Sequence, residues 1–327
     1  MSAHHPTTDL YFWNSCSVWA HRWWRRGAIR PFGENSFRCG TTLVLLRRDV
    51  PEIMQAATAW SGRLIYVIDD DIDAAAQAPS LPDGYRQRLT QFAQTHYDGL
   101  LRRADIVVAS SDALAQRLAA DSRIKGDIVR LDPYWDLPPA DQSHFRDASR
   151  RFDISHLGSA SHSGGLRGIA PTISKLIDEA VHLHFSYVGA RGLHPALEGH
   201  ARIHRISPMG WPRYRRWLAR RRFHLALYPL EDSRFDRARS TNKLLEHAIV
   251  GAAGIYPFDW SPAAIVGDGA MTAPADPTQW EGVLREAIAD PPALARRARM
   301  AAQALAPYQD PTMQRQFWIR WLGLEAA

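Results

Sequence analysis

The 327-residue sequence contains only two cysteines, Cys16 and Cys39, and no cysteine and histidine spacing typical of a zinc site. A disulfide framework is therefore excluded, and we expect a reducing compartment. No run of about 18 apolar residues occurs, so the sequence predicts no membrane-spanning helix. The first residues, MSAHHPTTDLYFWNS, lack the basic and apolar segments of a secretory signal, which indicates a cytoplasmic protein.

Lysine is also scarce, since only three lysines accompany 37 arginines in a chain whose formal net charge is +6. A bias of composition toward arginine explains this excess as well as a basic surface for phosphates does, so both interpretations stay open. The apolar content of 46% is that of an ordinary globular protein, and the length suggests two domains.

Apolar runs of strand length alternate with amphipathic segments, which is typical of a parallel β-sheet covered by helices. In the first half we expect strands at 9–13, 42–46, 63–68, 104–109 and 127–131 and helices at 51–60, 83–103 and 112–120. In the second half we expect strands at 153–157, 182–188, 201–206, 224–228 and 254–256, a helix at 169–180, and three helices within 277–324.

A polar, proline-containing stretch from 136 to 150 is the expected linker between the two halves. The sequence thus predicts an α/β protein with domains at 1–135 and 151–310 that face each other across a cleft. Ligands of such sheets bind beyond the carboxyl ends of the strands.

The most informative stretch is YPLEDSRFDRARSTNKLLEHAIVG, which begins at Tyr228. A charged loop follows a strand, and Ser240 stands where a helix cap is expected. Arg239 and Lys243 flank this helix start, whose backbone is already electropositive, so an anion such as phosphate would stabilise it. Glu246, one turn later, is a candidate acceptor for ribose hydroxyls. The alternative is that Lys243 and Glu246 form an ordinary ion pair along the helix.

A second loop suited to phosphate follows the strand expected at 153–157. Its residues are GSASHSGG, beginning at Gly158. Small residues let backbone N–H groups approach an anion, and Ser159, Ser161 and His162 add donors. The loop is neither a Walker loop nor a dinucleotide-binding fingerprint.

Together these residues resemble the donor-binding segment of the large family of bacterial retaining glycosyltransferases, family 4 or group 1, that includes sucrose synthases and mannosyltransferases. The resemblance rests on F-x3-R-S-x2-K-x2-E from Phe235 to Glu246, on YPL before it, and on HLGSASH at 156–162. IYVIDDDI at 65–72 and ADIVVASSDALAQRL at 104–118 resemble the first domain of that family. The resemblance implies the GT-B architecture, in which two Rossmann-like domains face each other across a cleft.

The same resemblance implies roles for the parts of the chain. The first domain would bind the acceptor, the second would bind the nucleotide-sugar, and a final helix in 311–327 would cross back onto the first domain. Glu246 would bind the ribose, and the helix start and the 158–162 loop would bind the diphosphate. The 209–211 loop would bind the base. The implied donor-binding residues are Gly158, Ser159, His162, Met209, Gly210, Trp211, Ser240, Thr241 and Glu246, and the candidate catalytic residues are Asp70, Asp71, Asp236, Arg239 and Lys243.

One position departs from the family pattern, because Ala238 stands where a first glutamate is widespread. Asp236 is the nearest acid for the donor sugar, and Glu231 and Asp232 are further candidates. The departure bears on the identity of the sugar and on the rate of catalysis.

Three consecutive aspartates, Asp69 to Asp71, follow an apolar strand. Adjacent carboxylates suit hard cations, but GT-B enzymes resemble one another in using basic residues and helix dipoles in place of a metal, so we expect no metal. Asp70 or Asp71 would contact an acceptor hydroxyl or stabilise positive charge at the sugar. The alternative is that these acids cap the next helix or pair with arginines across the cleft.

Two stretches, 21–26 and 211–223, combine tryptophan and arginine, which suits an anionic membrane surface. In the second stretch Trp211, Tyr214 and Leu218 recur at helical spacing, so a core-facing helix is the alternative. No nucleic-acid recognition motif accompanies either stretch, and we expect no nucleic-acid partner.

The sequence therefore predicts a glycosyltransferase that moves a sugar from a nucleotide-sugar to a glycan or lipid-linked acceptor, in the cytoplasm or at the inner face of the membrane, during surface-polysaccharide synthesis. The nucleotide-sugar is a co-substrate, and no cofactor is expected. Two alternatives remain: a catalytically silent GT-B protein that binds a glycan or partner, favoured by Ala238, and a GT-B epimerase.

Overall fold

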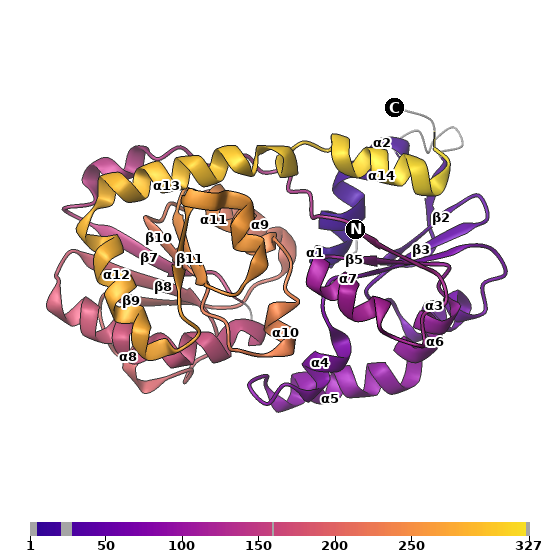
Figure 1. Ribbon diagram of the computed structural model, residues 1–327, viewed down its shortest axis with the longest axis horizontal. Helices are drawn as coiled ribbons and strands as arrows, with labels where there is room; N and C mark the ends of the chain where they lie inside the picture. Colours follow the sequence, from indigo (N-terminus) through magenta and orange to yellow (C-terminus); the bar gives the residue numbers. More distant parts are fainter. Residues whose placement is uncertain (1–4, 21–27, 159, 325–327) are drawn as a thin grey trace.

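The computed structural model describes residues 5–20, 28–158 and 160–324. Two six-stranded sheets, each with helices on its faces, lie side by side along the longest axis of the molecule (Figure 1). The α/β fold class expected from the sequence is confirmed.

The first sheet has the order β1-β2-β3-β4-β5-β6. Its strands are β1 (Ile29–Pro31), β2 (Ser36–Cys39), β3 (Thr42–Leu46), β4 (Leu64–Ile68), β5 (Ile106–Ala109) and β6 (Asp127–Arg130). β1, β2 and β3 pair antiparallel, whereas β3 to β6 pair parallel. Helices α3 (Pro51–Thr58), α4 (Ile72–Gln77), α5 (Asp83–Phe92), α6 (Asp98–Arg103) and α7 (Asp112–Ala119) connect the parallel strands.

The second sheet is parallel throughout and has the order β12-β11-β10-β7-β8-β9. Its strands are β7 (Phe152–His156), β8 (Leu183–Val188), β9 (Ile203–Ile206), β10 (Leu225–Leu227), β11 (Ala253–Pro257) and β12 (Ala270–Ala273). Its helices are α8 (Ser163–Glu179), α9 (Trp211–Leu218), α10 (Arg234–Arg237), α11 (Asn242–Ile249), α12 (Trp280–Ala289) and α13 (Pro291–Ala304). The strands β1, β2 and β12 carry too little alternation to be predicted.

The strand expected at 9–13 is wrong, because Asp9–Trp13 is a turn of π-helix between α1 (Pro6–Thr8) and α2 (Asn14–Ala20). Leu10, Tyr11 and Phe12 are all buried. A short apolar run that is buried on all sides has no periodicity that separates helix from strand.

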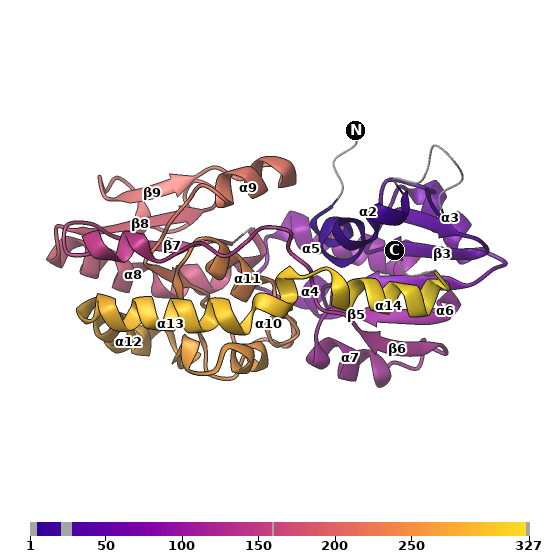
Figure 2. The same ribbon diagram turned by 90° about the horizontal axis from the view of Figure 1, so that it is seen from above.

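The last helix, α14 (Thr312–Leu322), packs against α2 of the first domain (Figure 2). The Gln314 side-chain amide donates to the Leu10 carbonyl at 2.7 Å, and the Trp318 indole donates to the Tyr11 carbonyl at 2.9 Å. The Leu10 carbonyl also accepts from the Tyr134 N–H at 2.7 Å, so side chains and backbone from distant parts of the chain bond the carbonyls of this irregular helical segment. The expected crossing of the final helix onto the first domain is confirmed.

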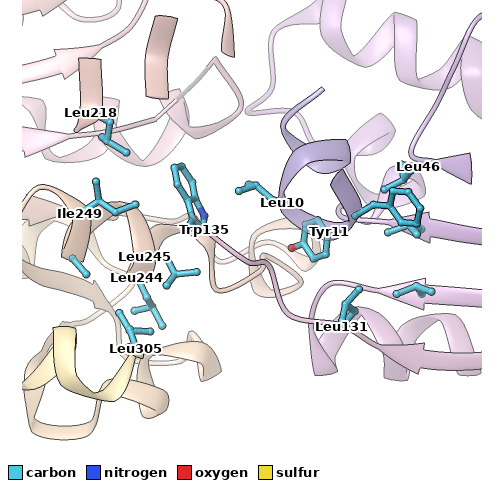
Figure 3. Packing of buried hydrophobic residues seen from close by; sticks show 14 of the residues in the cluster. Leu10, Tyr11, Leu46, Leu131, Trp135, Leu218, Leu244, Leu245, Ile249 and Leu305 are labelled. Atoms are coloured by element: carbon cyan, nitrogen blue, oxygen red, sulfur yellow. The ribbon is translucent and has the colours of Figure 1, made fainter. Parts of the chain in front are cut away.

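The junction between the two domains is built around Trp135, which is fully buried. Leu10 reaches toward it from the first domain, and Leu218, Leu245 and Ile249 lie on its other side (Figure 3). The Trp135 indole also donates to Asn242 Oδ1 at 3.2 Å. One apolar cluster therefore extends through both domains, which holds the carboxyl ends of the two sheets close together.

Candidate functional site

A cavity of about 770 Å³ lies between the domains. Much of its wall is formed by residues at or just after the carboxyl ends of parallel strands in both sheets, where ligands of open α/β sheets bind. These residues are Arg47 after β3, Asp69 and Asp70 after β4, Leu157 and Gly158 after β7, Val188 in β8, and Tyr228 after β10.

Helix α11 supplies the basic wall of the cavity. Thr241 occupies its cap position without a side-chain cap, and no acid lies in its first turn. The expected cap at Ser240 is wrong: its hydroxyl instead accepts from Asn242 Nδ2 at 3.0 Å. The helix therefore begins one residue later than expected, but Lys243 still lies in its first turn.

Lys243 and Glu246 form a buried ion pair along α11. The Lys243 ammonium also donates to the carbonyl of Leu157. Glu246 has Tyr214 of α9 as a second partner. Burial raises the pKa of the Glu246 carboxyl despite the lysine beside it. The structure therefore has the ion pair of Lys243 and Glu246 that the sequence left open as the alternative. Both side chains also line the cavity.

Arg239 lies buried where the two domains meet. Its guanidinium contacts Asp70 of the first domain at 3.3 Å and Asp236 at 3.4 Å, and it donates to the Ser161 carbonyl at 2.8 Å. The same group lies 4.0 Å from the centre of the Phe235 ring. Arg239 is thus held in one orientation, facing the cavity from its floor.

Asp69 and Asp70, which follow β4, share Arg47 as a partner, but their pKa values shift in opposite directions. Arg47 contacts both Asp69 and Asp70 at 2.9 Å. Burial alone would raise the pKa of Asp70, but Arg47 and Arg239 hold it below its usual value. For Asp69, burial outweighs Arg47 and raises the pKa. Asp70 therefore stays ionised between two arginines from opposite domains.

Two histidines lie on the opposing side of the cavity: His156, buried at the end of β7, and His162, half-buried in the loop that follows. Burial and the charges of Arg239 and Lys243 hold the pKa of His162 well below its usual value, and burial with Lys243 lowers that of His156 to about 3. Both rings are therefore neutral at pH 7. His162 lines the cavity, and its buried Nδ1 has no hydrogen-bond partner among the described residues.

No protein-family model and no curated protein sequence matches the chain. Solved structures do match it. Sucrose-phosphate synthase from Thermosynechococcus elongatus is 12% identical, with a TM-score of 0.57 over 82% of this chain and 70% of the enzyme. Anabaena HepE in complex with UDP-glucose is 13% identical, with a TM-score of 0.56 over 86% and 78%. The pneumococcal O-GlcNAc transferase GtfA, in complex with UDP and GlcNAc, is 11% identical, with a TM-score of 0.56 over 91% of this chain and 65% of GtfA.

The chain has the GT-B fold. Its interdomain cavity brings together most of the residues singled out from the sequence. Those that line it are Asp70, Gly158, His162, Met209, Gly210, Trp211, Arg239, Ser240, Lys243 and Glu246. They come from four separate segments of the chain, around residues 70, 158–162, 209–211 and 239–246, which the GT-B arrangement brings to one cavity.

Five of the described residues that the sequence singled out do not line the cavity, namely Asp71, Glu231, Asp232, Asp236 and Thr241. Asp71 caps α4, accepting from the Ala74 N–H at 3.1 Å. Asp236 accepts from the Ser233 hydroxyl at 3.1 Å, and Thr241 is buried at the helix cap. Their side chains support the fold of the surrounding loops. Ser159 and the 21–26 stretch lie outside the described residues.

Ala238, at the position of the missing glutamate, packs into the core of the first domain. Its carbonyl accepts from the Ser111 hydroxyl at 2.7 Å. Ala238 therefore contacts the first domain, whereas the next two residues of its loop, Arg239 and Ser240, line the cavity.

Sequence reasoning missed the cavity residues contributed by the first domain, chiefly His5, Arg47, Asp69 and Tyr85. Arg47 has a φ of 56°, the only positive value at a non-glycine position in the described chain. Such strain is frequent at functional sites, but it leaves no mark in the sequence. For Tyr214 of α9 the sequence left membrane contact and a core-facing helix as alternatives, and the side chain packs against the core and also lines the cavity.

No group of three or more histidine, cysteine, aspartate or glutamate side chains in the described ranges is arranged to hold a metal ion. In the same ranges no helix is both long and apolar enough to cross a membrane.

Proposed function

We propose that this GT-B protein is a retaining, metal-independent glycosyltransferase that transfers a sugar from a nucleotide-sugar to a glycan or lipid-linked acceptor. The observation that carries the proposal is the convergence of Arg239, Lys243, Glu246 and His162 on one interdomain cavity. The structures of HepE in complex with UDP-glucose and of GtfA in complex with UDP and GlcNAc support a nucleotide-sugar as the donor.

In this proposal the diphosphate of the donor lies against the start of α11. Lys243 and Arg239 donate to its oxygens together with the free N–H groups of the helix. His162, neutral and with a free ring nitrogen, donates from the opposite loop. These fixed donors stabilise the negative charge that builds on the diphosphate as the glycosidic bond breaks.

Donor binding then exchanges partners within the site. Lys243 turns from Glu246 to phosphate, and Glu246 accepts from the ribose hydroxyls instead. Arg239 turns from Asp70 to phosphate, which leaves Asp70 held by Arg47 and free to accept from an acceptor hydroxyl. Each buried charge thus keeps a partner, as the low dielectric of the site requires.

The proton balance needs no separate protein base. The acceptor oxygen bonds to the anomeric carbon on the side that the diphosphate leaves, and its proton passes to the departing phosphate oxygen. The products are the glycosylated acceptor and a nucleoside diphosphate.

The test is calorimetric titration of the wild-type protein with nucleoside diphosphates, UDP first, followed by an assay of nucleotide release from the matching nucleotide-sugars. We expect selective binding of one nucleotide and release of that nucleotide when its sugar is the substrate. Absence of binding by all of them would refute the proposal.

A catalytically silent role remains the second candidate, because Ala238 is used for domain contact and every cation of the cavity already has an internal partner. Under that role the protein would bind a glycan or partner enzyme in polysaccharide assembly. Nucleotide binding without release from any nucleotide-sugar would favour it.

We further propose that the acceptor is presented at an anionic membrane on the cytoplasmic side. Residues 199–230 contain eight arginines and no acid. They include the edge strand β9, helix α9 and the central strand β10, and α9 lies beside the junction of the domains (Figure 2). Arg213, Arg216 and Arg220 are exposed, and their side chains have no ion pair or hydrogen bond to any described residue. Each such arginine contributes about 1 kcal/mol near an anionic surface.

Vesicle flotation tests this contact. Wild type should float with phosphatidylglycerol vesicles at low salt and stay unbound with phosphatidylcholine. Arg213→Glu/Arg216→Glu should lose the binding, whereas Arg296→Glu/Arg299→Glu on α13, with the same change of charge, should retain it. Equal loss in both variants would contradict a role for α9.

A further inference from the structure

The chain makes a strained turn directly after β3. The Arg48 N–H bonds to the Leu46 carbonyl at 2.7 Å, and Arg47 between them has a φ of 56°. This three-residue turn with a positive central φ is rare and unfavourable for a residue with a Cβ atom. It persists because Asp69, Asp70 and the Tyr85 hydroxyl hold the Arg47 guanidinium.

The turn places the next residue, Arg48, in an unusual electrostatic environment. Arg48 is half-buried, and its side chain has no hydrogen bond or ion pair with any residue that the structure describes. Burial lowers its pKa, and the positive charges of Arg47 and Arg88 lower it further. Burial and the charges of Arg48 and Arg47 likewise lower the pKa of His5. The geometry agrees, because the Arg47 guanidinium donates to the Tyr85 hydroxyl at 3.1 Å and the Arg88 guanidinium lies 5.9 Å from the centre of the same tyrosine ring. His5 and Arg47 also line one cavity. Four basic side chains therefore cluster here.

The nearest carboxylates have other partners. Asp69 and Asp70 pair with Arg47, and Asp69 also accepts from Thr7. Asp49, the next residue in the chain, accepts from the backbone N–H groups of residues 34, 35 and 50 and from the Ser36 hydroxyl. None of these three carboxylates pairs with Arg48. A partly buried guanidinium without a counter-ion is unfavourable unless an anion binds beside it.

The cluster adjoins the interdomain cavity. Arg48 and Arg88 do not line it, but His5, Arg47 and Tyr85 do. The Arg88 guanidinium lies 5.9 Å from the centre of the Tyr85 ring. An anion at Arg48 would thus lie on the side of the cavity formed by the first domain, across from the proposed diphosphate site on α11.

We propose that Arg48, with Arg88 and His5, forms a second anion subsite that binds a phosphate group of the acceptor. That the phosphate belongs to the acceptor rests on the function proposed above, whereas the existence of the anion subsite does not. Arg48 donates to the phosphate from the turn, Arg88 from α5 and His5 from the segment before α1. The subsite selects acceptors that carry a phosphate within reach of the transferred sugar.

The test is calorimetric titration with inorganic phosphate, with and without saturating UDP. We expect wild type to bind phosphate while UDP is bound, because the two anion sites are separate. Arg48→Gln should weaken this binding about tenfold or more, the loss typical of one charge-assisted hydrogen bond, and Arg88→Gln should weaken it less. Arg102→Gln on α6 removes an exposed arginine of the same domain and should leave phosphate binding unchanged.

Stability gives a second measurement. Without ligand, Arg48→Gln should melt no lower than wild type, since it removes an unpaired charge among like charges. Glucose 6-phosphate and dihexanoylphosphatidic acid then separate the sources of the phosphate: tighter binding of the first indicates a soluble acceptor, and tighter binding of the second indicates a lipid.

Phosphate binding that is equal in wild type and Arg48→Gln, or that is lost in Arg102→Gln as well, would overturn the proposal. So would phosphate binding that UDP abolishes. If no nucleotide binds but phosphate still binds through Arg48, the proposed function fails while the anion subsite stands.

Discussion

The buried pair of Lys243 and Glu246 yields a prediction that separates folding from ligand binding. Lys243→Ala would leave the Glu246 carboxylate buried, with only Tyr214 as partner, and would remove the donor to the Leu157 carbonyl. Removing one member of a buried ion pair costs about 3–5 kcal/mol. That is a large part of the roughly 5–15 kcal/mol by which a domain is stable.

The double variant Lys243→Ala/Glu246→Gln should recover most of this loss, because the glutamine amide is neutral and still accepts from Tyr214. Nucleotide binding should not recover, because the ammonium that meets the diphosphate is absent. A hydrogen bond to a charged group contributes about 1.5–3 kcal/mol, which corresponds to a roughly 10- to 150-fold weaker affinity.

Urea denaturation would measure the stability of each variant, and calorimetry would measure nucleoside diphosphate affinity. The matched control is Lys175→Ala, which breaks the exposed pair of Lys175 and Glu281 at 2.8 Å and should cost less than about 1 kcal/mol. The reasoning is refuted if Lys243→Ala is no less stable than this control, or if the double variant binds nucleotide like wild type.

Three further predictions concern other parts of the site. Asp70→Asn removes the carboxylate that Arg239 contacts at 3.3 Å, so a nucleoside diphosphate should bind about fivefold more tightly, or ~1 kcal/mol by calorimetry, while sugar transfer slows. Weaker nucleotide binding would contradict the exchange of partners. His156 has a folded pKa of about 3, so only the unfolded chain takes up its proton as the pH falls from about 6.5; stability should fall by about 1.4 kcal/mol per pH unit from this residue, and His156→Gln should show a shallower slope in urea denaturation. Gly165→Ala would place a Cβ 2.0 Å from a backbone carbonyl oxygen and should cost about 1–3 kcal/mol of unfolding free energy, whereas Gly210→Ala, with open space around it, should melt like wild type.

The parallel strands could be predicted because their apolar runs are buried on both faces, as in β4, where all five residues are buried. The segment Asp9–Trp13 is also largely apolar and buried but is helical, and Gln314 and Trp318 donate to two of its carbonyls. Those partners lie about 300 residues away in the chain. No local sequence pattern indicates such a contact, so the strand expected at 9–13 could be corrected only from the tertiary structure.

The residues of the site likewise include some that local sequence patterns predict and some that they do not. Lys243 and Glu246 were predictable because helical spacing places them one turn apart, next to a helix start that lacks an acid. Arg47 was not predictable, since its position depends on a strained turn and on Asp69, which lies 22 residues away. The turn is favourable only once the aspartates are in place.

The internal pairing of the site also bears on which ligands it can accept. A free phosphate that took Lys243 would leave Glu246 buried without a cation, and one that took Arg239 would leave Asp70 with Arg47 alone. Such a ligand gains one charge-assisted contact and loses another, so the net gain is small. A nucleoside diphosphate differs because it carries both an anion and hydroxyl donors: its phosphates replace the carboxylates at the cations, and its ribose hydroxyls replace the lysine at Glu246. The ion pairs therefore make the empty cavity stable and at the same time disfavour ligands that bring only negative charge to α11.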